Sequence, residues 1–411
     1  MTRRTCISLI PSAALAQSGR RPSILLISGW NLHNIGDVAI TPGFLRLVQT
    51  HIPEAKVTVL LASYPKELGQ YIQERFPDVD VMPNEFQGGE PLSARMEQAF
   101  SDASLLVLNS GMTLSYGYYG NEWDRYIGRL LAFSKASQMG IPFGIYGHSF
   151  DMIKPPADIL YRDILNRASF LYTRDSESLK VLGGAGVRCP EMSFAPDSTF
   201  AFDLRDESRA RAFLQRHRLE SGKFTSFIPR LDVNRFRKDG KEKEHAAQTV
   251  AMIEHYVEKA REPVVLVHEV TRMLEPVKTM VFERLSARAK PLVRYEPEFW
   301  MPDEAQSVYA HSRMVVSMEM HSIILGLAAG TPSLHPYFKE AGLKQWMMRD
   351  LGVPDWMMDQ DTVDAETMAG RMHEIFKDPA GSRLKAGRVQ QTVKGHQSRT
   401  MAVLKRAIRR G

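Results

Sequence analysis

The sequence MVVSMEMHSIILGLAAGTP, residues 314–332, carries the clearest evidence for the fold of the chain. Its apolar run Met314–Ser317 predicts a buried strand. The small residues of Ser322–Ala329 predict a tightly packed helix, which a glycine and a proline end. Two titratable residues, Glu319 and His321, stand between strand and helix. A strand that passes directly into a helix is typical of an open α/β sheet, which binds ligands at the carboxyl ends of its strands.

The same alternation of short apolar runs and helical segments continues on both sides of this stretch. The other predicted strands are Ile24–Ser28, Val57–Ala62, Val79–Met82, Leu105–Leu108, Phe143–Tyr146, Phe170–Thr173, Phe224–Ile228, Val264–His268, Leu292–Arg294 and Ser333–His335. The composition changes at the charged, helical stretch Asp203–Gly222. We therefore expect an α/β protein with two Rossmann-like domains, residues 21–205 and 206–380, and a basic helical tail, residues 381–411.

Length and composition limit the classes of protein to consider. A chain of 411 residues is too long for one ordinary core, and its 44% hydrophobic and 24% charged residues are typical of a soluble fold. A net charge of +6 fits an anionic substrate or an acidic glycan, but the chain lacks the basic, aromatic-rich stripe of a nucleic-acid binder. Cys6 and Cys189 are too few for a disulfide framework. No apolar run reaches the roughly 20 residues of a membrane span.

Residues 1–20 predict an export signal or a disordered leader. A Thr-Arg-Arg opening, which resembles a twin-arginine signal, precedes the apolar run Cys6–Ala16. The Ala-Leu-Ala sequence before Gln17 has the small-x-small form of a cleavage site. We therefore favour export over a cytoplasmic location. The basic tail is interpreted as a solvated helix rather than as a membrane or nucleic-acid contact.

The loop after the first strand is a candidate anion site. Its sequence, Gly29–Asp37, is rich in turn-forming residues and leads into a helix, whose free N–H groups attract anions. Asn34, Gly36 and Asp37 are the candidate contacts. The loop lacks the G-x-G-x-x-G spacing of dinucleotide folds. A plain loop with a helix cap is the alternative.

A second candidate loop follows the strand Leu105–Leu108. It begins with Asn109, Ser110 and Gly111 and continues into the most aromatic segment of the chain, which contains Tyr116. Aromatic faces beside glycines suit a platform for a sugar. A loop that packs on its own domain is the alternative.

Three histidines that follow apolar runs, His148, His268 and His335, are interpreted as core residues. The chain contains neither the H-x-x-x-H nor the H-E-x-x-H spacing of zinc sites, so we expect no metal site.

Five motifs in order resemble those of the polysaccharide pyruvyl transferase family. They are Asn34-Ile35-Gly36-Asp37; Leu108 to Gly111, where the family usually has a glycine pair; Thr173-Arg174-Asp175-Ser176-Glu177-Ser178-Leu179; Ala195-Pro196-Asp197; and Ser317-x-x-x-His321 followed by Ala328-Ala329-Gly330-Thr331-Pro332. The resemblance implies a fold like that of the two-domain GT-B glycosyltransferases, with an interdomain cleft. It also implies transfer of a pyruvyl group from phosphoenolpyruvate to sugar hydroxyls, with no metal or organic cofactor.

The resemblance also assigns roles to individual residues. Such a site needs cations for the donor's carboxylate and phosphate, and an acid for its methylene carbon or its leaving phosphate. His321 is the expected general acid, and Arg174 is the expected anion clamp. Asp197 joins the site through its motif, and Lys339 or Lys344 lies near the family's lysine. A core histidine and a salt-bridged helix-cap arginine are the alternatives.

One position departs from the family pattern, which is Ser-x-Arg-x-His. Its third residue here is Glu319, which we group with His321 as the catalytic pair, with a surface carboxylate as the alternative. This change puts an anion beside an anionic donor, at a cost on the order of several kcal/mol if both are desolvated. Export would also separate the protein from phosphoenolpyruvate. Besides pyruvyl transfer to a cell-surface glycan, we therefore keep two hypotheses: another glycan-directed group transferase, glycosyltransferase-like in fold, and a non-catalytic exported glycan-binding protein.

Overall fold

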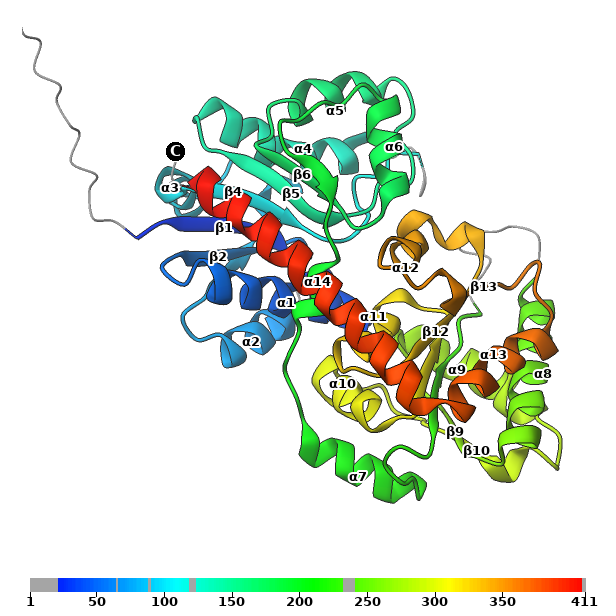
Figure 1. Cartoon of the computed structure of the whole chain (residues 1–411). Coiled ribbons are helices and arrows are strands. Elements are labelled where there is room, and N and C mark those ends of the chain that lie inside the picture. The colour runs from blue at the N-terminus through cyan, green and yellow to red at the C-terminus, as the bar shows by residue number, and fades with distance from the viewer. Residues whose placement is uncertain (1–20, 64–65, 88–89, 118–122, 232–240, 409–411) are drawn as a thin grey trace, which may run out of the picture.

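Two parallel β-sheets organise the chain, one in each half (Figure 1). The computed structural model describes residues 21–63, 66–87, 90–117, 123–231 and 241–408. The expected leader, residues 1–20, lies outside them. An α/β fold with two parallel sheets confirms the predicted fold class.

The first sheet has the strand order β3-β2-β1-β4-β5-β6-β7, and every neighbouring pair is parallel. Its strands are β1 Ser23–Ser28, β2 Lys56–Leu61, β3 Asp80–Pro83, β4 Leu105–Asn109, β5 Phe143–His148, β6 Phe170–Thr173 and β7 Met192–Phe194. The helices of this half are α1 Ile35–His51, α2 Lys66–Arg75, α3 Ala94–Asp102, α4 Trp123–Gln138, α5 Ala157–Leu165 and α6 Ser176–Gly184. Separate apolar clusters fill the two faces of the sheet, as its nearly continuous apolar strands require.

The second sheet has the order β10-β9-β8-β11-β12-β13 and is also parallel throughout. Its strands are β8 Thr225–Ile228, β9 Val264–Leu266, β10 Val293–Tyr295, β11 Met314–Ser317, β12 Ser333–Tyr337 and β13 Met357–Asp359. Its helices are α7 Glu207–His217, α8 Glu242–Ala260, α9 Leu274–Met280, α10 Pro302–His311, α11 Met320–Ala328, α12 Met347–Asp350 and α13 Ala365–Lys377. We keep residue 205 as the proposed domain boundary, because β7 ends before it and β8 begins after it.

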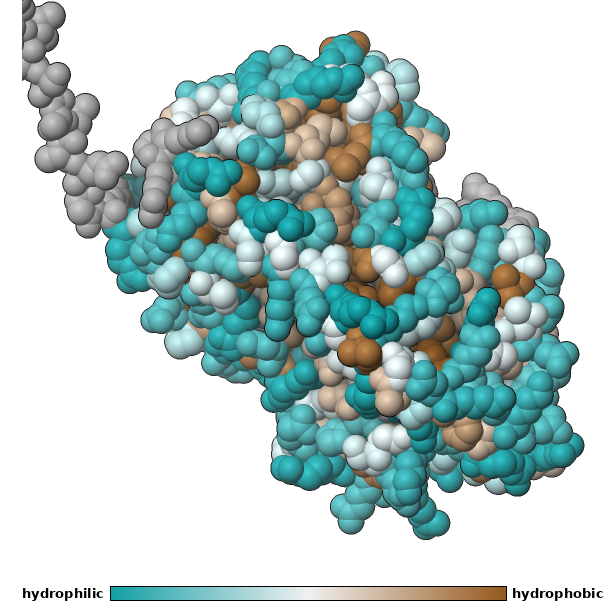
Figure 2. Space-filling view, in the orientation of Figure 1, coloured by the Kyte–Doolittle hydropathy of each residue, from teal (hydrophilic) through white to brown (hydrophobic). Residues whose placement is uncertain are grey.

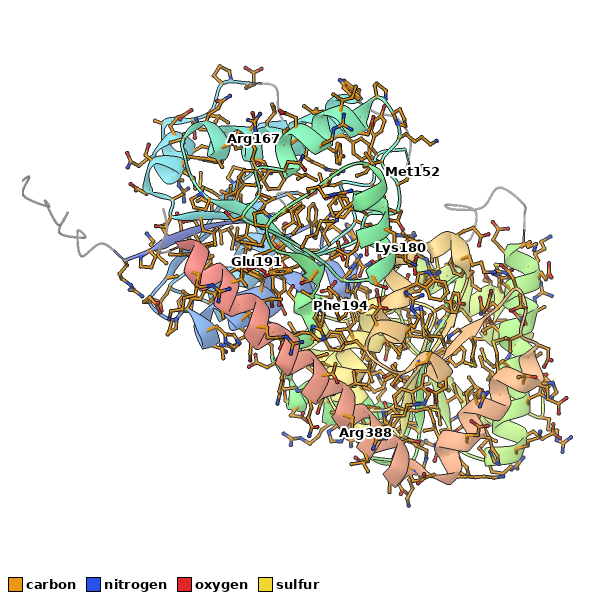
Figure 3. The ribbon with its side chains drawn as sticks, turned by 45° about the horizontal axis from the view of Figure 1, so that its top comes forward. Met152, Arg167, Lys180, Glu191, Phe194 and Arg388 are labelled. Atoms are coloured by element: carbon orange, nitrogen blue, oxygen red, sulfur yellow. The ribbon has the colours of Figure 1, made fainter. Side chains whose placement is uncertain are left out.

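A long final helix, α14 Pro379–Ile408, runs diagonally across both halves (Figure 1). Its first part buries Val389 in the core of the second half, and its last part buries Met401 and Leu404 in the core of the first. Figure 3 shows Phe194, at the end of β7, beside this helix, where its ring packs edge-on against His396 with centroids 5.0 Å apart. The predicted basic tail is therefore a helix that connects the two domains.

The surface is mostly hydrophilic, with small, scattered hydrophobic patches on the face in view (Figure 2). Within the described part of the chain, no helix has the length and apolar character needed to cross a membrane.

The strand orders place a topological switch point in each half. In the first sheet it lies between β1 and β4, and in the second between β8 and β11, because the chain continues in opposite directions from these strands. Ligands of open α/β sheets bind beyond the carboxyl ends of the strands at such points.

Candidate functional site

The loop after β1, at the switch point of the first sheet, contacts the loop after β9, the strand beside β8 in the second sheet. The N–H of Ile35, after β1, donates to the carbonyl oxygen of Glu269, after β9, at 2.9 Å. The N–H of Thr271 donates to the carbonyl oxygen of His33 at 3.0 Å, and Asn34 forms an isolated antiparallel bridge with Val270. The candidate site therefore lies where the two halves meet.

The first turn of α1 is built by the Asn34-Ile35-Gly36-Asp37 motif. The side chain of Asn34 caps the helix, since its Oδ1 accepts from the N–H groups of Gly36 and Asp37 at 2.8 and 3.4 Å. Gly36 lies directly against His321: a Cβ atom added to this glycine would be 2.0 Å from the imidazole Nδ1. The motif thus serves as a cap and also allows the histidine to approach the helix.

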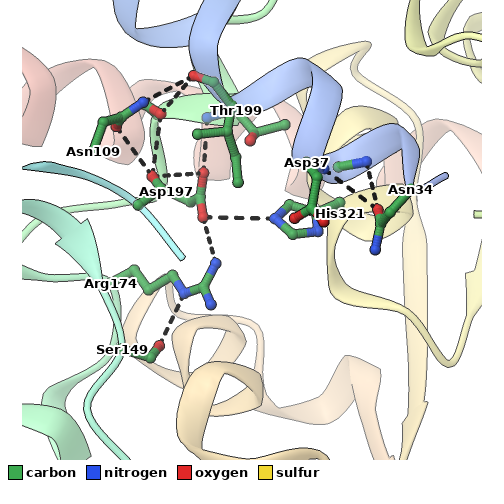
Figure 4. A network of polar contacts seen from close by, with 12 residues as sticks. Asn34, Asp37, Asn109, Ser149, Arg174, Asp197, Thr199 and His321 are labelled. Carbon is green, nitrogen blue, oxygen red and sulfur yellow. Dashed lines mark hydrogen bonds and ion pairs between the residues drawn. The ribbon is translucent and has the colours of Figure 1, made fainter. Parts of the chain in front are cut away.

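Asp37 points toward the same histidine from the next position of α1 (Figure 4). Burial raises the pKa of this carboxyl, with the nearby His321 charge opposing the rise and the Glu269 charge adding to it. Asn31 donates a hydrogen bond to the carboxylate. Asp37 is therefore a carboxyl group whose proton is held more tightly than usual.

Arg174 and Asp197 form a buried ion pair in the first half (Figure 4). The guanidinium Nη1 lies 2.7 Å from Oδ2 of Asp197, and its Nε donates to Oγ of Ser149 at 2.9 Å. The other oxygen of Asp197 accepts from the Thr199 N–H at 2.9 Å. Burial alone would raise the pKa of Asp197, but the charges of Arg174 and His321, with these hydrogen bonds, lower it.

Asn109, Ser110 and Gly111 support this pair from the end of β4. Ser110 donates to Oδ1 of Asp197 at 3.2 Å, and the fully buried Asn109 amide donates to the carbonyl oxygen of Ile40 at 3.1 Å. Ser110 and Gly111 have φ values of 50° and 84°, in the left-handed region that favours glycine. This geometry explains why a glycine pair is usual at this place in the family.

His321 lies in the first turn of α11 and is held by Glu269. Its Nδ1 is 3.2 Å from Oε1 of Glu269, whose Oε2 accepts from the N–H and hydroxyl of Ser322 at 2.6 and 2.7 Å. The imidazole Nε2 is 3.9 Å from Oδ2 of Asp197 and has no hydrogen-bond partner among the described residues. Burial opposes ionisation of Glu269, but the hydrogen bond and charge of His321, followed by Ser322, lower its pKa below the ordinary value.

Glu319 has a different partner from the one that the sequence led us to expect. Its Oε2 lies 2.5 Å from Nη1 of Arg230, and both side chains are buried. The carboxylates beside His321 are those of Glu269 and Asp197, so the expected pairing of Glu319 with His321 is wrong. The physical reason is that Arg230, after the adjacent strand β8, satisfies the buried negative charge.

The two candidate lysines lie in different environments. Lys344 is part-buried, and burial lowers its pKa, with the Glu319 charge opposing this and the Arg230 and Arg174 charges adding to it. Lys339 is exposed and lies 3.2 Å from Oδ2 of Asp359. The structure therefore brings Lys344, but not Lys339, into the group around His321.

Tyr116 does not face this group. Its ring is buried in the core of the first half, where it packs edge-on against Trp123 and Tyr126 at centroid distances of 5.6 and 5.1 Å. The arrangement is that of a loop packed on its own domain, and residues 118–122 of the expected platform lie outside the described residues.

The three other histidines are core residues, as predicted. His268 and His335 bond to the carbonyl oxygens of Glu296 and Ser317 at 2.9 and 2.7 Å, and burial lowers the pKa of both to about 4. Burial, with the charge of Arg174, lowers the pKa of His148 well below its ordinary value. In the described parts of the chain, no group of three or more His, Cys, Asp or Glu side chains could hold a metal ion.

Two residues of the site, Glu269 and Arg230, were not identified from the sequence. Each follows a strand of the second sheet by two or three residues, at the edge where the sheet topology places ligands. That position is the signal that could have identified them, because both are charged residues within three positions of the end of a buried strand.

A family model described as polysaccharide pyruvyl transferase matches residues 34–335. Comparison of the sequence with curated proteins gave no match. Among solved structures, Anabaena HepE in complex with UDP and glucose has a TM-score of 0.57 at 13% identity, covering 93% of this chain and 98% of that one. The putative UDP-N-acetylglucosamine 2-epimerase from Listeria monocytogenes has a TM-score of 0.60 at 9% identity, covering 95% and 98%. These similarities confirm the GT-B-like fold that the motifs implied.

Proposed function

Because the chain belongs to the polysaccharide pyruvyl transferase family, we propose that it transfers a pyruvyl group from phosphoenolpyruvate to hydroxyl groups of a glycan at the cell surface. The observation that carries this proposal is the setting of His321. Its Nδ1 is held by Glu269, while its Nε2 lacks a hydrogen-bond partner among the described residues and lies near the Arg174–Asp197 pair.

The reaction needs a proton at one carbon and the departure of phosphate. In ketal formation, a first sugar hydroxyl adds to C2 of phosphoenolpyruvate while the methylene carbon takes up a proton and becomes a methyl group. A second hydroxyl then replaces the phosphate at C2, and its proton leaves with the phosphate. In each step the attacking hydroxyl gives up one proton, and the methylene carbon or the leaving phosphate takes one up, so both an acid and a base are required.

We assign the first proton to Nε2 of His321. The hydrogen bond to Glu269 makes Nδ1 a donor, which leaves Nε2 to carry the transferable proton. Glu269 is fixed in turn by the N–H and hydroxyl of Ser322. Asp37, whose pKa burial raises, is suited to accept the proton of an attacking hydroxyl and return it.

The donor's carboxylate and phosphate require cations. The side chain of Lys344 forms no hydrogen bond or salt bridge with any described residue, so its ammonium group is available to an anion. The guanidinium of Arg174 already bonds to Asp197 and Ser149. We therefore propose that its positive charge attracts the anionic donor without contacting it directly.

The test is phosphate release from phosphoenolpyruvate in the presence of candidate glycans, with the pyruvyl ketal detected by NMR. His321→Asn should lower kcat at least about a hundredfold, the low end for general acid catalysis. His255→Asn, in α8, is the matched control and should leave kcat unchanged. Full activity of His321→Asn would contradict the assignment.

The second candidate is a nucleotide-sugar transferase on the same scaffold. It is favoured by the structural likeness to HepE, which was solved with UDP and glucose. Turnover of UDP-glucose without turnover of phosphoenolpyruvate would support this function. Binding of oligosaccharide with no turnover of either donor would support the alternative of a non-catalytic glycan-binding protein.

A further inference from the structure

A buried ion pair lies at the switch point of the second sheet. Strands β8 and β11 are parallel neighbours, with Ile228 opposite Ser317. Arg230 and Glu319 each follow these residues by two positions, so the two side chains leave the sheet at the same level. Their charged atoms are 2.5 Å apart, and the side chains are 5% and 2% exposed.

The local structure fixes this pair in place. The hydroxyl of Ser317 donates to the carbonyl oxygen of Glu319 at 2.8 Å and accepts from its N–H at 2.9 Å, which defines the turn into α11. On the other strand, the N–H of Arg230 contacts the sulfur of Met318 at 3.2 Å. Both charges are therefore held at the end of their strands.

Stability alone does not explain a pair of this kind. Removing two charges from water costs about as much as their attraction returns, and well-packed apolar residues often do as well or better. A second ion pair joins the part-buried Arg313 to the buried Glu262 and lies before β11 and β9, at the opposite edge of the same sheet, where ligands of such sheets do not bind. The two pairs thus allow a functional role to be separated from a structural one.

The Arg230 guanidinium lies among the other groups of the site. Glu319 is two residues from His321 along the chain, and the charges of both members of the pair act on Lys344. Arg174 also acts on Lys344, from the first half. Three cations therefore converge near the histidine, one from the end of β6, one from the end of β8 and one from the segment after β12.

We propose that Arg230 is a substrate-binding residue that contacts the carboxylate or phosphate of an anionic donor, and that Glu319 positions its guanidinium for that contact. This inference rests on the proposed function for the identity of the donor. It also gives Glu319 a role: the cation that the family pattern carries at this position comes instead from the neighbouring strand, and Glu319 holds it there.

The experiment compares three double variants of the full-length protein. Arg230→Gln with Glu319→Gln keeps the side-chain shapes and removes both charges. Arg230→Glu with Glu319→Arg exchanges the charges and keeps a cation at the edge. Arg313→Gln with Glu262→Gln is the matched control. The readouts are KM and kcat for phosphoenolpyruvate, and calorimetric Kd values for phosphoenolpyruvate and for inorganic phosphate.

The neutral variant should raise KM and both Kd values about tenfold to a hundredfold, the range for loss of a hydrogen bond to a charged group, with a smaller change in kcat. The exchanged variant should recover at least part of the lost affinity, and the control pair should leave affinity unchanged. Wild-type affinity in the neutral variant would overturn the proposal, as would a wild-type protein that binds neither anion.

Two further results show whether the anion contact fails by itself, or whether the proposed function or the folding of the variant is at fault. If the wild type binds phosphate through Arg230 but does not turn over phosphoenolpyruvate, the proposed function fails and the anion contact stands. If the neutral variant does not fold, Arg230→Lys keeps the charge but loses the planar fork. Arg230→Lys should raise KM severalfold with an unchanged Tm, and an unchanged KM would overturn the proposal.

Discussion

The imidazole of His321, in the second half of the chain, lies against the backbone of Gly36, in the first. A Cβ atom at position 36 would lie 2.0 Å from Nδ1 and 2.6 Å from Cβ of the histidine, which is closer than any real contact. The proposed acid thus depends on close contact between the first turn of α1 and the first turn of α11.

Gly36→Ala should therefore separate the two helices and displace the histidine. We expect an unfolding free energy lower by about 1–3 kcal/mol, the usual cost of overpacking, and a much larger loss of activity. Urea unfolding and kcat measure the two effects. Gly370→Ala, where a Cβ atom meets nothing within 4 Å, is the control and should stabilise α13 by roughly 0.5–1 kcal/mol. Wild-type activity in Gly36→Ala would contradict the contact.

Glu269→Gln should lower kcat at least about tenfold with little change in the donor KM. The amide can still bond to Ser322, but it no longer supplies the carboxylate that fixes Nδ1 of His321 as a donor and orients the imidazole. The double variant with His321→Asn should be no worse than His321→Asn alone, because the two residues act as one unit. Glu296→Gln, in the buried pair with His217, is the control and should leave kcat unchanged.

Asp197→Asn should reveal a pH-dependent contribution to stability. The folded-state pKa of Asp197 is depressed, so its charge stabilises the protein above the unfolded pKa near 3.8, and this stability is lost as pH falls through the lower folded value. The variant leaves Arg174 without its buried partner and should lose about 3–5 kcal/mol near pH 7. Below pH 4, the free energies of unfolding of the variant and the wild type, measured by urea unfolding, should become more similar. A difference independent of pH would exclude this linkage.

Lys344→Met should raise stability while it weakens donor binding. Burial lowers the pKa of this lysine from 10.5, so its charged form is unfavourable in the folded state. The wild type should accordingly become more stable between pH 7 and 10 through this group, and the variant should lack that gain. Thermal unfolding at pH 7 and at pH 10 tests the effect on stability, and the Kd for phosphoenolpyruvate tests the effect on donor binding. Lys339→Met should change neither Kd nor the pH dependence.

The sequence predicted the fold well where strands are fully buried. Apolar runs such as Ile24–Ser28 and Met314–Ser317 are central strands covered on both faces, and such strands are recognisable without knowledge of their neighbours. The edge strands Met192–Phe194 and Met357–Asp359 were not predicted. Each has three residues and is only partly buried, so neither carries a continuous apolar run.

The candidate site was predicted in part, for a physical reason. Motifs identified His321, Arg174 and Asp197, which the fold brings together although they lie in different halves of the chain. The partners Glu269 and Arg230 depend on which strands are adjacent, and sequence spacing does not reveal strand order. A single charged residue after a strand becomes meaningful only when the order β9-β8-β11 is known.

The segment that carries Lys344 is attached to the first half at both ends, which leads to the last prediction. The N–H of Leu343 donates to Oδ1 of Asp151 at 2.6 Å, and the carboxylate of Asp350 accepts from the N–H and hydroxyl of Ser176, at the start of α6, at 2.7 and 2.9 Å. Asp350 thereby caps a helix of the other half, an interaction worth about 0.5–2 kcal/mol.

Asp350→Ala should release this segment and move Lys344 away from the donor. We expect the KM for phosphoenolpyruvate to rise about threefold to tenfold, with kcat at saturating donor nearly unchanged, because the variant leaves the His321–Glu269 pair intact. In combination with Lys344→Met it should add no further loss of affinity, since both changes remove the same contact. Asp355→Ala, which removes an exposed ion pair with Lys385, is the control. Additive losses in the double variant would show that Asp350 acts on the donor independently of Lys344.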